Sequence, residues 1–468
     1  MSTEFFILMK SELSLVLIIF LLLFFKLFEV VKDSSKLVTL INVILTINFL
    51  FGFIFNQTGT LFSGMYITNE LISFEKSILN LGTLIISLQA FEWLKQHKHL
   101  LEFYILLLAT LLGMNFMISS GNFLIFYLGL ELASIPLAAL VNFDLHKLKS
   151  SEAATKMILS SAFASGIMLF GISLLYGVCG SLNFIEIVSM LSASKLTILS
   201  VLFIFTGFAF KLSIVPFHFW TADVYEGAPM SITAYLSVIS KGAIVFVFIS
   251  ILSNLFLNLN NIWFNLLSIL LVITVSIGNL FALRQDNLKR FLAYSSIAQV
   301  GFILLGLSPN SPIGNSSVIY FLVVYLFSNL GVFGVVTLVS SSTGKENISD
   351  LKGFYTNNKT LSWILAIALF SLAGVPPTAG FFGKMFLITS GASKGNYFII
   401  ICAALNMVIS LYYYLNVVKV MFVDKNEDAL PKLKIQTSIG ISLIVCILGV
   451  LLIGFSGGLF EYINLLFA

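Results

Sequence analysis

The sequence contains little charge. Of its 468 residues only 10% are Asp, Glu, Lys or Arg, whereas 59% are hydrophobic and the mean hydropathy is +1.04. A soluble globular domain has about 25% charged residues. The composition therefore excludes an ordinary soluble domain and indicates an all-α polytopic membrane protein in a lipid bilayer. In this setting the formal net charge of +4 does not indicate binding to nucleic acid.

Cysteine is scarce as well. The three cysteines, Cys179, Cys402 and Cys446, lie far apart and form no Cys-x-x-Cys or Cys/His spacing. Neither a disulfide framework nor a metal site is predicted, and we expect no cofactor in this chain. Any redox chemistry should then belong to a partner subunit.

Charged and turn-rich breaks divide the chain into about fourteen apolar spans. The longest breaks, near 56–72, 178–196 and 340–360, are too short to bury a core of their own, so 1–468 is expected to be a single membrane domain. The first apolar run has no small-residue cleavage site after it. We therefore expect a retained first helix rather than a signal peptide.

Basic residues are concentrated in alternate loops. If the N-terminus lies outside, the cytoplasmic loops hold Lys32, Lys36, Lys95, Lys98, Lys147, Lys149, Arg284, Lys289, Arg290, Lys345, Lys352, Lys359, Lys419, Lys425, Lys432 and Lys434. The loops on the opposite side hold only Lys10, Lys76, Lys195 and Lys394. This asymmetry predicts that both termini face the outside. The number of spans suits a bacterial inner membrane.

Five charged residues fall inside apolar spans, each on a different helix: Glu131, Lys156, Lys211, Lys241 and Lys384. A charge at the bilayer centre costs roughly 3 kcal/mol, so such residues usually serve a function. Burial disfavours the charged form of carboxyl and ammonium groups alike, which allows both to exchange protons near neutral pH. We therefore predict a proton relay.

Some of these residues have a simpler interpretation. Lys156 lies four residues after Glu152, the favourable spacing for a structural ion pair on a helix. Glu131 could be a single carboxylate fixed to a neighbouring helix. His218, seven residues after Lys211, is either a relay member or a histidine at the membrane interface.

Proline interrupts two of the spans. Pro216 follows Lys211 in FKLSIVP, and Pro376 and Pro377 precede Lys384 in VPPTAGFFGK. Proline removes a helical hydrogen bond, and broken backbone is tolerated at membrane depth only inside protein or beside water. The lysine precedes the proline in one span and follows it in the other. This order fits paired inverted repeats whose interrupted helices mark a transport path.

Several stretches together resemble a known family: GLELASIPLAAL, SSEAATKMILSSAFASGIMLFGISLLYGVCGS, FAFKLSIVPFHFWTADVYEGAPMSITAYLSVISKGA, NLKRFLAYSSIAQVGF and SLAGVPPTAGFFGKMFL. They are similar to chain N of proton-translocating NADH-quinone oxidoreductase, respiratory complex I, among the antiporter-like membrane subunits. The similarity covers about residues 120–420, and Tyr225 to Pro229 resemble chain N rather than its sister chains.

The resemblance implies fourteen transmembrane helices with two inverted five-helix repeats, in which helices 7 and 12 are interrupted. The repeats would occupy 99–256 and 260–422, after an N-terminal part at 1–98 and before a last helix at 435–468. The family's FMN, iron–sulfur clusters and quinone would lie in partner subunits. Other membrane-arm subunits, including a neighbouring antiporter-like chain, are the implied partners.

The resemblance also implies roles for the five charged residues. Glu131 matches the fifth-helix glutamate, Lys156 and Lys211 the sixth- and seventh-helix lysines, Lys241 the central lysine and Lys384 the lysine at the outer exit. Related chains often have histidine where this sequence has Gln299. Glutamine can hydrogen-bond a chain of waters but cannot hold an extra proton near pH 7.

Other functions remain open at this stage. A cation/proton antiporter subunit can share the fold and the lysines, and so can a membrane subunit of a related hydrogenase or ferredoxin-driven complex. A purely structural spacer is a further alternative, against which the buried charges argue. The Tyr-Glu-Gly-Ala-Pro stretch at Tyr225 favours the oxidoreductase subunit over the antiporter.

Overall fold

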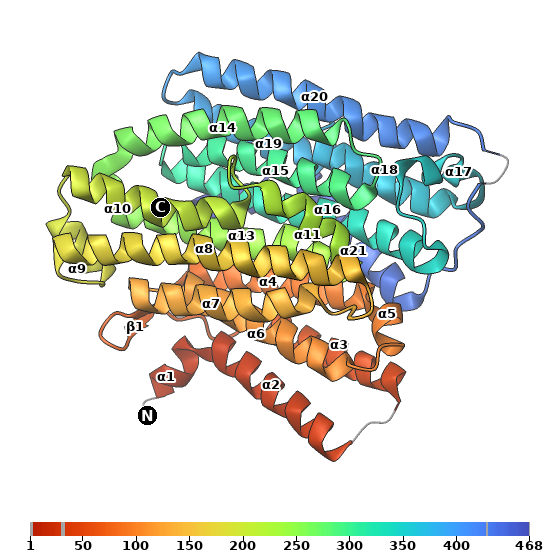
Figure 1. Cartoon of the computed structure of the whole chain (residues 1–468), viewed down its shortest axis with the longest axis horizontal. Coiled ribbons are helices and arrows are strands. Elements are labelled where there is room, and N and C mark those ends of the chain that lie inside the picture. Colours follow the sequence, from red (N-terminus) through yellow and green to blue (C-terminus); the bar gives the residue numbers. More distant parts are fainter. Residues whose placement is uncertain (1–2, 30–32, 427–428, 468) are drawn as a thin grey trace.

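The computed structural model describes residues 3–29, 33–426 and 429–467; Met1, Lys32 and Ala468, which entered the prediction of orientation, lie outside them. Long helices lie side by side through the molecule, from the N-terminal helices at one margin to a C-terminal helix at the other (Figure 1). We call the end of the bundle that carries Lys95, Lys147, Arg284 and Lys345 the inner end. The opposite end is the outer end.

Within the described residues, 13 helical runs are long and apolar enough to cross a membrane. They are α2 (Lys10–Phe28), α3 (Ser34–Phe51), α4 (Glu70–Gln89), α6 (Leu100–Ile118), α7 (Phe123–Val141), α8 (Leu148–Cys179), α10 (Lys195–Leu212), the run Met230–Leu255, α14 (Asn260–Ala282), α15 (Leu288–Leu307), α16 (Pro312–Thr343), α20 (Tyr397–Phe422) and α21 (Thr437–Phe455). Two shorter helices, α18 (Lys359–Ala373) and α19 (Ala379–Ala392), together form one more crossing. The prediction of about fourteen spans is confirmed.

The run Met230–Leu255 is not uniform. It consists of α12 (Met230–Tyr235), the π-helical turn η1 (Leu236–Ser240), α13 (Lys241–Ser250) and a second π-helical turn, η2 (Ile251–Leu255). Wide π turns within α-helices are frequent at functional sites. Here the first one ends directly before Lys241.

Short elements connect the crossings. They are α1 (Thr3–Leu8), the antiparallel strands β1 (Gly59–Leu61) and β2 (Tyr66–Thr68), α5 (Phe91–Lys95), α9 (Phe184–Met190), α11 (Phe219–Gly227), η3 (Leu257–Leu259), η4 (Ile348–Leu351), α17 (Phe354–Asn357) and α22 (Gly458–Leu465). Polar side chains set where several long helices begin. Asn69, Asn122, Ser194 and Asn287 each accept a hydrogen bond from a first-turn backbone N–H of α4, α7, α10 and α15.

The helices differ in how much of their apolar surface the chain itself covers. The most apolar stretch of α16 is 100% buried, and that of α15 is 89% buried, whereas only 22% of the corresponding stretch of α2 is buried. An apolar surface that stays exposed in the isolated chain suits contact with lipid or a partner helix. The centre of the bundle therefore consists of α15, α16 and the run Met230–Leu255.

The first interrupted crossing breaks directly after Lys211. Helix α10 ends at Leu212, the next residue, Ser213, has a φ of 64°, and the N–H of Ile214 donates to the carbonyl of Ala209 at 2.8 Å. The peptide bond between Val215 and Pro216 is cis. The chain then turns into the short helix α11.

The second interrupted crossing repeats this backbone pattern. Helix α18 ends at Ala373, the next residue, Gly374, has a φ of 86°, and the N–H of Val375 donates to the carbonyl of Phe370 at 2.9 Å. The peptide bond between Pro376 and Pro377 is also cis. The two predicted interruptions are thus confirmed as matching breaks, as expected for repeats. The exact repeat boundaries stay a prediction.

Candidate functional site

Lys241 lies at the centre of the bundle. Its side chain is 3% exposed, and its Nζ donates a hydrogen bond to Ser296 Oγ of α15 at 2.9 Å. The Tyr225 ring lies 5.7 Å from the same nitrogen. None of the ion pairs among the described residues includes Lys241. This lysine is therefore held by neutral groups.

Lys211 lies at the broken end of α10. Its Nζ donates to Ser134 Oγ of α7 at 2.6 Å and to Ser161 Oγ of α8 at 2.9 Å. Glu131 lies on α7 one turn before Ser134, whose hydroxyl accepts the hydrogen bond from Lys211. One oxygen of Glu131 is buried and has no hydrogen-bond partner among the described residues.

A small cavity separates Lys211 from the turn that carries Lys241. It has a volume of about 20 Å³, and Ser134, Lys211, Trp220 and Ser240 are among its lining residues. A site of roughly 10–15 Å³ can hold one water. Ser240 directly precedes Lys241, so one water in this cavity would lie between Lys211 and the turn that ends before Lys241.

Helix α15 connects Lys241 with Lys384. Ser296, Gln299 and Phe302 follow one another at intervals of three residues and therefore share one face of the helix. Ser296 accepts the hydrogen bond from Lys241, while the Phe302 ring lies 4.9 Å from Lys384 Nζ. Gln299 lies between the two contacts.

The break in α18 provides acceptors for this connection. The side-chain nitrogen of Gln299 donates to the carbonyl of Leu372 at 3.2 Å, and Lys384 Nζ donates to the next carbonyl, that of Ala373, at 3.1 Å. Carbonyls at a helix end have no intrahelical partner, so they are free to accept. Lys384 is 1% exposed, and its other hydrogen-bond partner is Ser410 Oγ at 3.5 Å.

Lys156 differs from these lysines. We placed it among the buried charges, but its side chain is 44% exposed and pairs with Glu152 and Asp223, each at 2.7 Å. Helix α8 is long, and Lys156 lies near its inner end, where α11 offers carboxylates. The expectation of burial was wrong, and the ion pair with Glu152 is present. A role for Lys156 in the relay stays a prediction.

A network of ion pairs surrounds Lys156 at the inner end. Arg290 of α15 binds Asp223 and Glu226 of α11, both at 2.9 Å, and Lys149 of α8 binds Glu226 at 2.9 Å. Burial alone would raise the pKa of both carboxyl groups, but their hydrogen bonds to these cations lower each pKa below its ordinary value. Both stay ionised at neutral pH.

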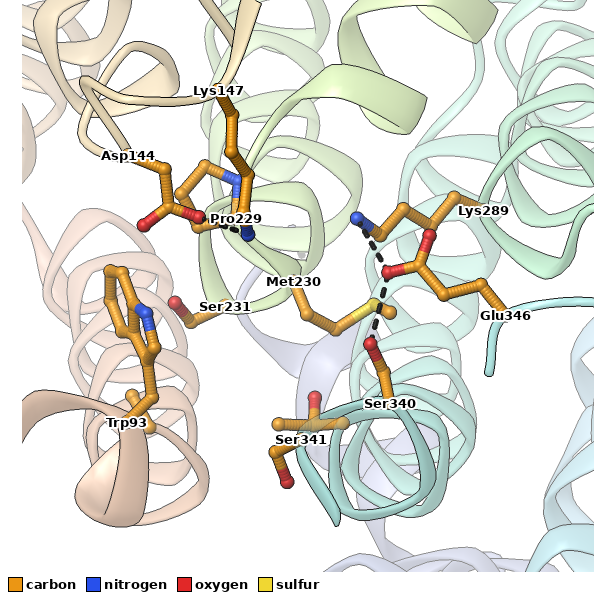
Figure 2. A pocket seen from close by; sticks show the side chains of 12 residues that line it. Trp93, Asp144, Lys147, Pro229, Met230, Ser231, Lys289, Ser340, Ser341 and Glu346 are labelled. Carbon is orange, nitrogen blue, oxygen red and sulfur yellow. Dashed lines mark hydrogen bonds and ion pairs between the residues drawn. The ribbon is translucent and has the colours of Figure 1, made fainter. Parts of the chain in front are cut away.

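A second polar cavity opens at the inner end, beside the start of α12. Figure 2 shows Asp144 and Lys147 on one side of it and Lys289 with Glu346 on the other, with Met230 between them and Ser231 on the side of Asp144. The cavity has a volume of about 150 Å³. Lys289 pairs with Glu346 at 3.1 Å, and Ser231 lies on the same helical run as Lys241. This cavity is a polar access to the central helix.

Lys76 was missed by the sequence reasoning. We placed it in an outer loop, yet it lies within α4, is 2% exposed and pairs with Glu12 of α2 at 2.6 Å. Tyr66 of β2 completes the cluster: its OH donates to Glu12 at 2.8 Å and accepts from Lys76 at 3.1 Å. The close pairing of Glu12 and Lys76 depends on two helices that are distant in sequence, which left no local signal.

The remaining predicted residues lie at the breaks. His218 is 7% exposed, precedes α11 directly and has a ring nitrogen, Nδ1, that forms no hydrogen bond with a described residue. Pro216, Pro376 and Pro377 are exposed on the isolated chain. Over residues 3–29, 33–426 and 429–467, no group of three or more His, Cys, Asp or Glu side chains could hold a metal ion.

A membrane bundle with two matching broken helices, inside which Lys241 and Lys384 are almost fully buried, is typical of the class of antiporter-like ion-translocating subunits. The chain belongs to the family NADH:quinone oxidoreductase/Mrp antiporter, TM, which matches residues 120–410. It is 46% identical over 461 residues to the NADH-quinone oxidoreductase subunit N of Phocaeicola vulgatus, covering 97% of both chains. It is 49% identical over 415 residues to the subunit of the same name from Azobacteroides pseudotrichonymphae, covering 88% of this chain and 86% of that one.

Solved structures agree with this assignment. A chain of respiratory complex I from Thermus thermophilus with bound aureothin matches with a TM-score of 0.82 at 26% identity, covering 96% of this chain and 97% of that chain. A chain of the Mrp complex from Dietzia sp. matches with a TM-score of 0.86 at 18% identity, covering 98% and 96%. The second likeness shows the shared fold alone.

Proposed function

We propose that this chain is the proton-translocating membrane-arm subunit of an NADH-quinone oxidoreductase. The subunit N relatives and the resemblance to chain N support this. FMN, iron–sulfur clusters and quinone would lie in partner subunits, and a neighbouring antiporter-like chain would adjoin this one. The basic residues of the inner end favour a bacterial inner membrane with both termini outside.

One observation carries the proposal: the ammonium groups of Lys211, Lys241 and Lys384 are each hydrogen-bonded inside the bundle by neutral hydroxyl or carbonyl groups rather than by carboxylates. Each Nζ can give up a proton and take another, because a neutral amine remains hydrogen-bonded by the same neutral partners. A lysine fixed to a carboxylate would instead keep its charge.

The mechanism begins at Glu131. Quinone reduction elsewhere in the complex would change the charge of the adjacent subunit and thereby that of Glu131, which lies one turn from the Ser134 hydroxyl that binds Lys211. A proton would then leave Lys211 for Lys241 and pass along the α15 face that carries Gln299 to Lys384. Moving one charge against 100 mV costs about 2.3 kcal/mol, which quinone reduction would supply.

The test uses the intact complex in closed vesicles. The Lys241→Ala variant should assemble and still reduce quinone, but proton transfer through this chain should be abolished and the number of protons moved per electron pair should fall. Lys195→Ala, at the exposed start of α10, is the matched control. A Lys241→Ala complex with the proton yield of the unaltered complex would rule out the relay.

A second measurement addresses the partners. Gentle purification through a tag on this chain should recover flavin and iron–sulfur absorbance together with NADH-dependent quinone reduction. Recovery of a complex without a flavin would instead indicate that the complex uses an electron donor other than NADH.

A cation/proton antiporter is the second candidate, because the family matched by residues 120–410 includes Mrp antiporter subunits by its description. Such a subunit would exchange Na⁺ or K⁺ for protons without an electron donor. Sodium-driven proton movement in vesicles that lack NADH would favour it.

A further inference from the structure

A third cavity opens at the outer end of the bundle. It has a volume of about 380 Å³ and lies where α4 and α16 begin and where α6 and α13 end. Its wall is mostly apolar or neutral, with Phe246, Ile249, Asn254 and Asn310 among the lining residues. Its one ionisable lining residue among the described part of the chain is Glu75 of α4.

Glu75 is an unusual carboxyl group. Its side chain is 4% exposed, and no hydrogen bond or ion pair joins it to another described residue. Its sequence neighbour Lys76 is paired with Glu12 on the α2 side. Consecutive residues on a helix do not face each other. Lys76 therefore points towards Glu12 of α2, whereas Glu75 lies at the outer cavity on a different side of α4. A carboxyl group buried at such cost needs a reason.

Helix packing places Glu75 next to the turn of Lys241. Gly82 of α4 meets the side chain of Ile239, and Gly242 meets that of Leu79, so α4 and the central run lie antiparallel. Glu75 comes one turn before Leu79, towards the outer end. In this register Lys241 is level with Asn80, so Glu75 lies five residues, roughly 7.5 Å along the axis, beyond Lys241.

The central run thus links two cavities. Ser231 lines the inner cavity, Lys241 follows ten residues later, and Ile249 lines the outer cavity after a further eight. At 1.5 Å per residue these separations are about 15 Å and 12 Å. Glu75 stands on the neighbouring helix along the second part of this route.

We propose that Glu75 is a proton-release site: it takes a proton that leaves the Lys241 ammonium through intervening water and gives it to water in the outer cavity. The amine of Lys241 is then free to receive the next proton, and the Glu75 carboxylate is restored. This route leaves the membrane without passing Lys384. The inference rests on the proposed function, because it requires Lys241 to carry protons.

The test compares two glutamate variants of the same helix in the intact complex. Glu75→Gln keeps the size of the side chain but cannot release a proton, so the proton yield per electron pair should fall, though less than in the Lys241→Ala complex, because the Lys384 route remains. Glu70→Gln, an exposed residue on the first turn of α4, should keep the full yield. Glu75→Asp should restore part of what Glu75→Gln loses.

The outcomes separate the two ideas. A full yield in Glu75→Gln with a lost yield in Lys241→Ala would overturn the release site and leave the proposed function standing. A full yield in both would overturn the proposed function itself.

A labelling experiment covers the case in which Glu75→Gln does not assemble. Asn254→Cys places a thiol at the rim of the outer cavity. A bulky thiol reagent that cannot cross the membrane should react from the outer side and lower the proton yield by at least half, while the unaltered complex should not respond. A labelled variant with the full yield would contradict the release site.

Discussion

Lys76 and Lys241 are both almost fully buried, at 2% and 3% exposure, but they have different partners. Lys76 is fixed by the Glu12 carboxylate at 2.6 Å, whereas Lys241 is held by the hydroxyl of Ser296 at 2.9 Å. A close counter-ion stabilises the charge and makes its loss costly, while a hydroxyl can serve the ammonium and the amine alike. Burial alone does not identify a lysine as a proton carrier. The hydrogen-bond partner determines whether the lysine can lose its proton.

The largest expected effect comes from removing one half of the fixed pair. Lys76→Met leaves the Glu12 carboxylate buried without its counter-ion, which should cost about 3–5 kcal/mol. The amount of assembled complex on native gels and its thermal midpoint should both fall strongly. Lys36→Met, an exposed residue of α3, is the control. The double variant Glu12→Gln with Lys76→Met should recover much of the lost stability. A Lys76→Met variant of normal stability would show that Glu12 and Lys76 do not form a buried ion pair.

A new counter-ion should make Lys241 behave like Lys76. Ser296→Asp places a carboxylate where Lys241 now has a hydroxyl, so the ammonium should become fixed. We expect an assembled complex that reduces quinone but moves fewer protons per electron pair, as in Lys241→Ala. Ser296→Thr keeps the hydroxyl and should preserve the yield. Normal pumping by Ser296→Asp would show that the partner of Lys241 does not matter.

The inner ion pairs extend the comparison to charges that stay fixed. Arg290→Ala removes the shared partner of Asp223 and Glu226, and partly exposed pairs contribute about 1 kcal/mol or less. Their lowered pKa values mean that this stabilisation is present at neutral pH and is lost as the pH falls below the ordinary carboxyl values of 3.8 and 4.5. Thermal midpoints of the variant and the unaltered complex should differ at pH 7 and converge below about pH 4. An equal difference at both pH values would exclude this origin.

The smallest effect is expected at Gln299. Gln299→Leu removes the hydrogen bonds to the carbonyl of Leu372 and to Tyr414. The face of α15 between Lys241 and Lys384 then has no polar side chain at this position. If Glu75 offers a second exit, the proton yield should fall only in part. Gln299→Asn is a milder variant with the same chemistry. Complete loss in Gln299→Leu would assign all flux to the Lys384 route.

The sequence predicted much of the site because isolated charges and prolines are conspicuous in apolar spans. Lys211, Lys241 and Lys384 were recognised in this way, and the breaks after Lys211 and before Lys384 lie where the prolines predicted them. Lys76 escaped because its stretch ELISFEKSILN reads like a polar helix end, and only α2 supplies its partner. Lys156 was misplaced for a similar reason: one of its partners, Asp223, is 67 residues away along the chain.

The apolar composition and the spacing of charges and prolines, by themselves, determined a membrane bundle of about fourteen spans with two interruptions. The reason is that a bilayer requires long apolar helices, so a charge or a proline within such a helix is easily recognised in the sequence. The tertiary structure decided which charges have counter-ions, which carbonyls the breaks free, and where cavities meet Lys241 and Glu75. Those features depend on contacts between helices far apart along the chain. No local pattern of residues encodes such distances.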